Sequence, residues 1–196
     1  MAPPPPPPSG FNFSFPPSLE PYNLSLSAYL PTRSRNLPVP LKYAATGALV
    51  FNSQNKILLI QRAPHDSMPL KWEIPGGAID EEDLTVLYGL ARELWEEAGL
   101  LLKKVVRVVN LGEEPDVFFT RSGRLVEKVS FEVEVEDTEK VRLDPEEHVN
   151  FCWVGEEECR GGGTEEGMEL EFSTVRQRAV VCRGFELRRG EGEKGE

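Results

Sequence analysis

Apolar residues recur along the middle of the chain in short runs that are typical of β-strands. Two runs, 43–51 and 56–62, are separated by the polar residues 52–55, which favour a hairpin turn. A third run, 72–74, is stopped by Pro75, Gly76 and Gly77. Further strands are predicted at 103–111, 117–120, 126–135 and 151–154.

The longest of these strands has strictly alternating positions. Val129, Phe131, Val133 and Val135 alternate with a serine and three glutamates. Because successive side chains of a strand point to opposite faces, the pattern predicts one buried face and one wet face.

Two segments have helical spacing instead. In 84–98 the residues Leu87, Ala91, Leu94 and Ala98 form one narrow apolar stripe, and 174–187 has a similar pattern. Strands outnumber helices, and the helices are interspersed among them. The sequence therefore predicts an α/β fold with a mixed sheet and helices on its faces.

The two ends of the chain differ from its middle. Residues 1–40 hold 12 of the 17 prolines and three charged residues, and residues 190–196 are charged and glycine-rich. The prediction is a disordered proline-rich arm at 1–40, one domain at 41–189 and a disordered tail at 190–196. Residues 3–8, all proline, favour a polyproline II helix, which could bind a domain that recognises this conformation, although a solvated tail is the simpler interpretation.

Composition narrows the classes of function. A formal net charge of -11 argues against binding duplex nucleic acid, and an anionic ligand would need a bridging cation. No apolar run approaches the roughly 20 residues that span a bilayer. The N-terminus lacks the basic and apolar regions of a secretory signal, so an intracellular, cytoplasmic protein is expected. The three cysteines, Cys152, Cys159 and Cys182, are then expected to be structural thiols.

Three carboxylates share one side of the first predicted helix. Glu93, Glu96 and Glu97 cluster there, and like charges at this spacing weaken an isolated helix. A cation would reverse that penalty, whereas a solvated acidic face is the usual meaning of such a cluster.

The surroundings of these acids resemble the Nudix box. Its second half is Arg-Glu-apolar-x-Glu-Glu-x-Gly-apolar, and residues 92–100, RELWEEAGL, match it at every defined position. Gly77 matches the glycine that opens the box. The first half departs from the pattern, because Asp83 stands where a glutamate is usual and the following spacer is one residue longer.

The resemblance implies a Nudix-like α/β/α sandwich and a hydrolase that uses Mg²⁺ or Mn²⁺. Such a hydrolase cleaves the diphosphate bond of a nucleoside diphosphate linked to another moiety, by attack of metal-activated water on phosphorus. By the same resemblance Glu93, Glu96, Glu97 and the Gly77 carbonyl would be the metal ligands, and Arg92 would orient a glutamate. Members that have lost catalysis serve as nucleotide-binding or interaction modules, which is the alternative function.

A further acid from a later loop often joins the Nudix site. Glu147 is the predicted general base, with Glu146 or a plain surface role as alternatives. Arg62 could contact phosphate, and Phe118 and Phe119 could stack on a base, although strand-end and core roles are equally compatible with their positions. His65 and His148 lack metal-ligand spacing and are predicted on the surface.

Overall fold

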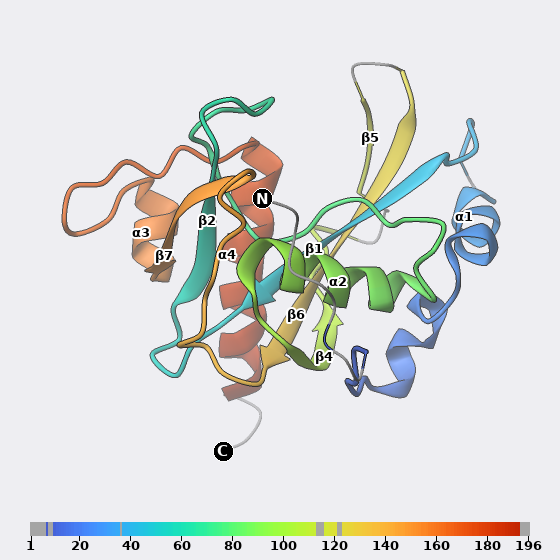
Figure 1. Ribbon diagram of the computed structural model, residues 1–196, viewed down its shortest axis with the longest axis horizontal. Helices are drawn as coiled ribbons and strands as arrows, with labels where there is room; N and C mark the ends of the chain where they lie inside the picture. The colour runs from blue at the N-terminus through green and yellow to red at the C-terminus, as the bar shows by residue number, and fades with distance from the viewer. Residues whose placement is uncertain (1–6, 8–9, 36, 113–115, 121–122, 193–196) are drawn as a thin grey trace.

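The computed structural model describes residues 7, 10–35, 37–112, 116–120 and 123–192. It has a mixed α and β architecture, which confirms the predicted fold class (Figure 1). Within the described residues, no helix combines the length and the apolar character needed to cross a lipid bilayer. In chain order the elements are η1 (Pro17–Tyr22), α1 (Leu26–Ser34), β1 (Tyr43–Val50), β2 (Ile57–Arg62), β3 (Trp72–Glu73), α2 (Val86–Ala98), β4 (Leu102–Val108), β5 (Val117–Phe119), β6 (Leu125–Val135), β7 (His148–Val154), α3 (Glu156–Gly161) and α4 (Val175–Gly192).

The strands form two sheets. In the mixed sheet β6 pairs parallel with β1 and antiparallel with β4 and β5. In the second sheet β2 pairs antiparallel with β3 and β7. Helices α2 and α4 cover opposite faces of the mixed sheet, because Ala48 of β1 packs in the α2 core whereas Leu49 packs against α4.

The predicted hairpin of the first two strands is only partly correct. Its turn forms, since Asn52 N donates to Lys56 O and Phe51 bridges Ile57. Beyond that bridge β1 and β2 separate into different sheets. The free edge of β1 is instead occupied by the segment before α2, which accepts hydrogen bonds from Thr46 and Ala48. Once these backbone donors are bonded, β2 has to pair elsewhere.

The predicted wet face of β6 is only partly correct. Ser130 lies near Ile74 and Glu132 pairs with Arg188 of α4, and both are buried, whereas Glu134 and Glu136 at the end of the strand are exposed. Glu132 is 2% exposed and forms ion pairs with Arg107 and Arg188. A buried carboxylate needs such cationic partners. Arg107 and Arg188 are distant from Glu132 in the sequence, so the alternation within the strand could not predict these pairs.

The predicted disorder of residues 1–40 is also wrong for the described part of that segment. Residues 10–35 contain η1 and α1 and lie against the mixed sheet (Figure 1). Leu19 and Tyr29 are buried, and Ser14 pairs with β4 through hydrogen bonds to Lys103 and Val105. Although the segment is rich in proline, its apolar side chains bury enough surface to offset the entropic cost of ordering it. Most of the predicted polyproline run, residues 3–6 and 8, lies outside the described residues.

The N-terminal segment is also tied down by charge. Glu127 of β6 is fully buried on the α1 side, accepts a hydrogen bond from the Tyr29 hydroxyl at 3.0 Å and pairs with the Arg33 guanidinium through Nε at 2.9 Å. The chain is therefore ordered well before the predicted boundary at residue 41. At the other end α4 runs through Gly192, into the predicted tail, while residues 193–196 lie outside the described part.

Helix α2 matches its predicted packing. All four stripe residues, Leu87, Ala91, Leu94 and Ala98, are fully buried. Thr85 caps its N-terminus by accepting from Tyr88 N, and Gly99, at a φ of 66°, ends it. Leu24 of the N-terminal segment accepts a hydrogen bond from Val86 N, so this segment also satisfies one donor of the first turn. The helix that carries the three acids is thus fixed from both ends.

Candidate functional site

Two glycines bring the chain close to the acidic face of α2. Gly76 has a φ of 141°, and a Cβ there would lie 2.3 Å from Thr46 O, so only glycine fits. Its backbone N–H donates to Glu97 Oε2 at 2.6 Å. A Cβ on Gly77 would lie 2.6 Å from Glu93 Oε2. The pair therefore lets the loop after β3 touch both carboxylates.

The pKa values of Glu97 and Glu93 are both raised by their surroundings. Glu97 is 6% exposed, and burial raises its pKa well above the ordinary value despite the hydrogen bond from Gly76. Burial likewise raises the pKa of Glu93 to about 7, although the Arg92 charge opposes the shift. The negative charges of Glu93 and Glu147 raise the pKa of Glu97 further. Both acids thus lie where an additional cation would be stabilising.

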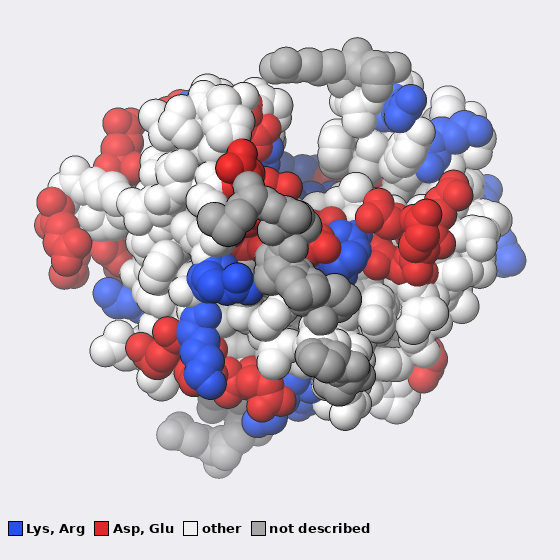
Figure 2. All heavy atoms as spheres, viewed as in Figure 1, with Lys and Arg blue, Asp and Glu red and all other residues white. Residues whose placement is uncertain are grey.

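Arg92 holds the other side of this cluster together. Its guanidinium donates to Asp83 through Nε at 2.9 Å and Nη2 at 2.8 Å, and to Glu93 and Glu96 through Nη1 at 2.9 and 2.8 Å. Asp83 is buried and also accepts from Asp80 N. The aspartate at which the box departs from its usual form is therefore the anchor of the arginine. Figure 2 shows red acidic side chains gathered over this loop, with blue basic atoms at their edge.

The side of the site opposite α2 is formed by β7. His148, at the start of this strand, was predicted on the surface, and that prediction is wrong. This residue is 2% exposed, and its Nε2 lies 3.4 Å from Glu73 Oε1 and 4.0 Å from Glu97 Oε1. Its Nδ1 has no hydrogen-bond partner among the described residues. β7 pairs with β2 and turns the ring inward, which a spacing argument along the chain cannot detect.

Arg62 does not present a free guanidinium. It forms ion pairs with Glu73 and Asp66 through its two terminal nitrogens. Burial raises the pKa of Glu73, but the hydrogen bond with His148 and the charges of Arg62 and Lys128 together outweigh this effect. The pKa is therefore below its ordinary value, and the carboxyl is ionised. Glu73 is a site residue that was not predicted from the sequence. The available signal was a glutamate inside an apolar strand, between Trp72 and Ile74.

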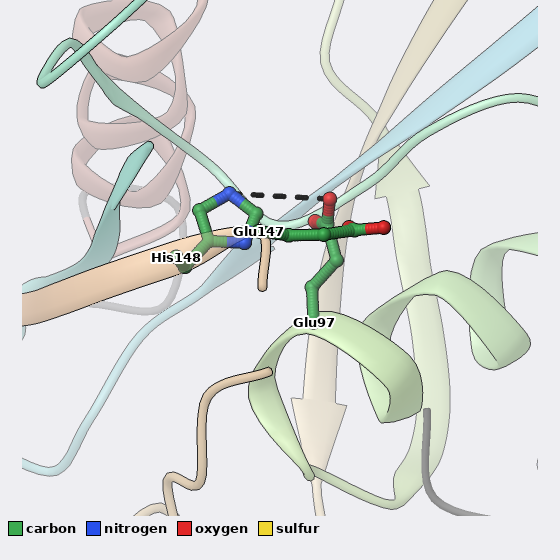
Figure 3. A group of neighbouring side chains, drawn as sticks. All are labelled: Glu97, Glu147 and His148. Carbon is green, nitrogen blue, oxygen red and sulfur yellow. Dashed lines mark ion pairs between the residues drawn. The ribbon is translucent and has the colours of Figure 1, made fainter. Parts of the chain in front are cut away.

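Three side chains from different elements converge on this side of the site. Glu97 of α2, Glu147 of the turn before β7 and His148 each offer a ligand atom, and these atoms lie within 4.8 Å of one another (Figure 3). Glu147 is exposed, whereas the other two are buried. They line a cavity of about 420 Å³ together with Arg62, His65, Asp66 and Glu146.

Other predicted residues lie away from this cluster. Glu96 is turned toward Arg92. Phe118 and Phe119 are 44% and 63% exposed on β5. The Gly77 carbonyl accepts a hydrogen bond from Thr46 N at 2.8 Å, which leaves it one lone pair. A larger groove of about 1010 Å³ lies between α4 and the end of β4, and none of these acids lines it.

A divalent cation fits the donor set. Carboxylate and carbonyl oxygens suit Mg²⁺ and Mn²⁺, and the raised pKa values of half-buried Glu93 and buried Glu97 show that both carboxylates are short of positive charge. Glu93, Glu97 and Glu147 are the residues able to supply these oxygens.

Comparison with known proteins supports the resemblance. An RNA pyrophosphohydrolase of Psychrobacter is 42% identical over 62 residues, which are 32% of this chain and 33% of that protein. A MutT-like protein of Streptomyces ambofaciens is 38% identical over 61 residues, 31% of this chain and 36% of its own length. The chain thus spans about a third of the length of these curated relatives.

Solved structures share the fold. The MutT protein from Methanosarcina mazei Go1 superposes with a TM-score of 0.57 at 24% identity, covering 79% of this chain and 99% of that one. The E. coli ORF135 protein gives a TM-score of 0.56 at 21% identity, covering 77% and 94%. The NUDIX domain family model matches residues 41–170, more than half of the chain and the whole of the glutamate-bearing helix. The chain therefore belongs to the Nudix family.

Proposed function

We propose that this protein is a metal-dependent hydrolase that cleaves the diphosphate bond of a nucleoside diphosphate linked to another moiety. The observation that carries the proposal is the convergence of Glu97 and Glu93 on α2 with Glu147 just before β7 and His148 at its start. The names of the relatives, an RNA pyrophosphohydrolase and MutT-like proteins, agree with a nucleotide-derived substrate. We further propose that it acts in the cytoplasm.

The metal would be Mg²⁺ or Mn²⁺, held by Glu93 and Glu97, with the second lone pair of the Gly77 carbonyl as a further donor. When bound, it would neutralise the diphosphate and polarise the phosphorus under attack. This also explains how a chain with a net charge of -11 could bind a polyanion.

The chain's own groups would position and activate water. Glu147 is the proposed general base, because its carboxylate is exposed at the cavity while its neighbours are buried. Arg92 keeps Glu93 and Glu96 in place through its anchor on Asp83. Water would add to phosphorus as Glu147 accepts its proton, and the bond between that phosphorus and the bridging oxygen would break, with the oxygen leaving on the other phosphate with the electron pair.

The test is hydrolysis of a panel of nucleoside diphosphate derivatives with Mg²⁺ or Mn²⁺, coupled to a phosphatase that detects the exposed phosphate monoesters. Substitution Glu97→Gln should lower kcat by roughly a hundredfold or more, as is typical when one charge-stabilising group is removed from an active site. The control is Glu134→Gln, which changes an exposed carboxylate on β6 and should leave kcat unchanged.

A wild-type protein that hydrolyses nothing on the panel would contradict the proposal. If it still binds nucleotides, the binding-module alternative applies. One observation favours that alternative, since Arg92 already engages two of the three box glutamates.

A further inference from the structure

One face of β6 leads from the hairpin tip toward the carboxylate cluster. Lys128 is opposite Ala45 and Ser130 is opposite Gly47 on the parallel neighbour β1, while Phe118 of β5 is opposite Val126. Since register partners and alternate residues share a face, Phe118, Val126, Lys128 and Ser130 lie on the same side of the sheet.

That side faces the segment that carries Glu73. A Cβ on Gly47 would lie 2.8 Å from Ile74 Cδ1 and 3.3 Å from Ser130 Oγ, so Ile74, the residue after Glu73, packs over this face. The charge of Lys128 is also felt by Glu73, where it helps to lower the carboxyl pKa. Lys128 is therefore close to the wall of the candidate site formed by Glu73, Arg62 and His148.

Lys128 is an unusual residue for its position. It is half-buried in the middle of the central strand of the mixed sheet, and its chain neighbours Glu127 and Val129 are buried on the opposite face. Glu73 is already bonded by Arg62 and His148, and within the described part of the chain Lys128 forms no ion pair of its own. Its ammonium is not among the buried unpaired atoms of the described residues, so it is accessible to water and available to an anionic ligand.

We propose that Lys128 is a substrate-binding residue that contacts the phosphate group farther from the carboxylates, with Phe118 beside the attached moiety. The inference rests on the proposed function, because it names a second contact for the same diphosphate. The proposed cation would neutralise the phosphate nearest the glutamates, and Lys128 would neutralise the other. Figure 2 shows the surface hollowed beside the β5–β6 hairpin, where such a ligand would enter.

The experiment compares wild-type protein with Lys128→Met, which keeps the length of the side chain and removes its charge, and with Lys128→Arg, which retains a positive charge. Binding of ADP in the presence of Mg²⁺ is measured by calorimetry, with adenosine as the uncharged probe. Loss of a charge-assisted contact should raise the Kd for ADP about tenfold in Lys128→Met and leave adenosine binding unchanged. Lys128→Arg should restore most of the ADP affinity. Lys103→Met, an exposed position on β4, is the control and should bind ADP like the wild type.

Kinetics and stability distinguish substrate binding from a structural role. On any substrate that the wild type hydrolyses, Lys128→Met should raise KM about tenfold, with kcat within roughly threefold, and weaken the dependence of KM on salt. The ligand-free melting temperature should stay the same, because the ammonium is accessible to water and its loss removes no ion pair of the described residues. A lower melting temperature with an unchanged Kd would mean that Lys128 only balances Glu73, and would overturn the inference.

The remaining outcomes separate this inference from the proposed function. If the wild type hydrolyses a substrate and Lys128→Met binds ADP equally well, only the inference fails. If Lys128 is needed for ADP binding but nothing is hydrolysed, the proposed activity fails and the inference stands. A wild type that does not bind ADP would overturn the inference directly.

Discussion

At the scale of single residues, Asp83 has a larger role than its place in a loop indicates. It forms two hydrogen bonds with Arg92, which in turn holds Glu93 and Glu96. Asp83→Ala should lower the free energy of unfolding by about 1–3 kcal/mol, because the buried side of the arginine loses its partner. It should also weaken Mg²⁺-dependent stabilisation, since the glutamates lose their support.

Chemical denaturation and thermal melting with and without Mg²⁺ measure both effects. Glu81→Ala, which changes an exposed acid in the same loop, is the matched control. Equal Mg²⁺ responses in Asp83→Ala and the wild type would show that the arginine does not position the glutamates.

The cysteines give a second prediction at this scale. Burial raises the pKa of the Cys152 thiol to about 12, and it also raises the pKa values of Cys159 and Cys182. Since the thiolate is the reactive form, alkylation by iodoacetamide at pH 8 should be slow in the folded protein and fast in urea. Mass spectrometry over time measures this. Rapid labelling of all three cysteines in the folded state would contradict the expected structural role.

Among single residues, sequence reasoning succeeded where the signal is local. The buried stripe of α2 follows from spacing within one helix. Burial of Glu73 and His148, and the pairing of Arg62, depend on how β2, β3 and β7 meet, which involves residues up to 75 positions apart. Spacing along the chain contains no information about such contacts.

At the scale of elements, the N-terminal segment is the main departure from expectation. Its Arg33 bonds the fully buried Glu127 of β6. Arg33→Met should destabilise the protein by about 3 kcal/mol, because it leaves a buried carboxylate without its cation. The double variant Arg33→Met with Glu127→Met should regain much of that loss, since an apolar pair has no charge to bury.

Urea denaturation of the single and double variants tests this coupling. Arg35→Met, just beyond α1, is the control and should change stability by less than about 0.5 kcal/mol. An Arg33→Met protein as stable as the wild type would show that η1 and α1 are not bound through this pair.

Composition misled the prediction for this segment. Prolines at the start of η1 and within α1 argue against regular structure, yet Leu19 and Tyr29 are buried and Ser14 extends the mixed sheet beside β4. Aromatic and leucine side chains contribute more to order than the prolines remove.

At the scale of the whole molecule, the strand and helix ranges predicted from periodicity match the structure within a few residues, and the sheet pairings do not follow from them. The turn at 52–55 is the clearest case, because the same sequence serves a hairpin or a crossing between sheets. The edge of β1 to which β2 could have paired is instead bonded by the loop that carries Gly76 and Gly77.

The docking of the N-terminal segment also has a consequence for synthesis on the ribosome. Arg33 and its partner Glu127 are 94 residues apart. At a translation rate of about 5–20 residues per second, Arg33 would be made roughly 5–20 seconds before its partner. The N-terminal segment therefore cannot form this buried ion pair until β6 has been made, so its native docking has to wait for that part of the mixed sheet.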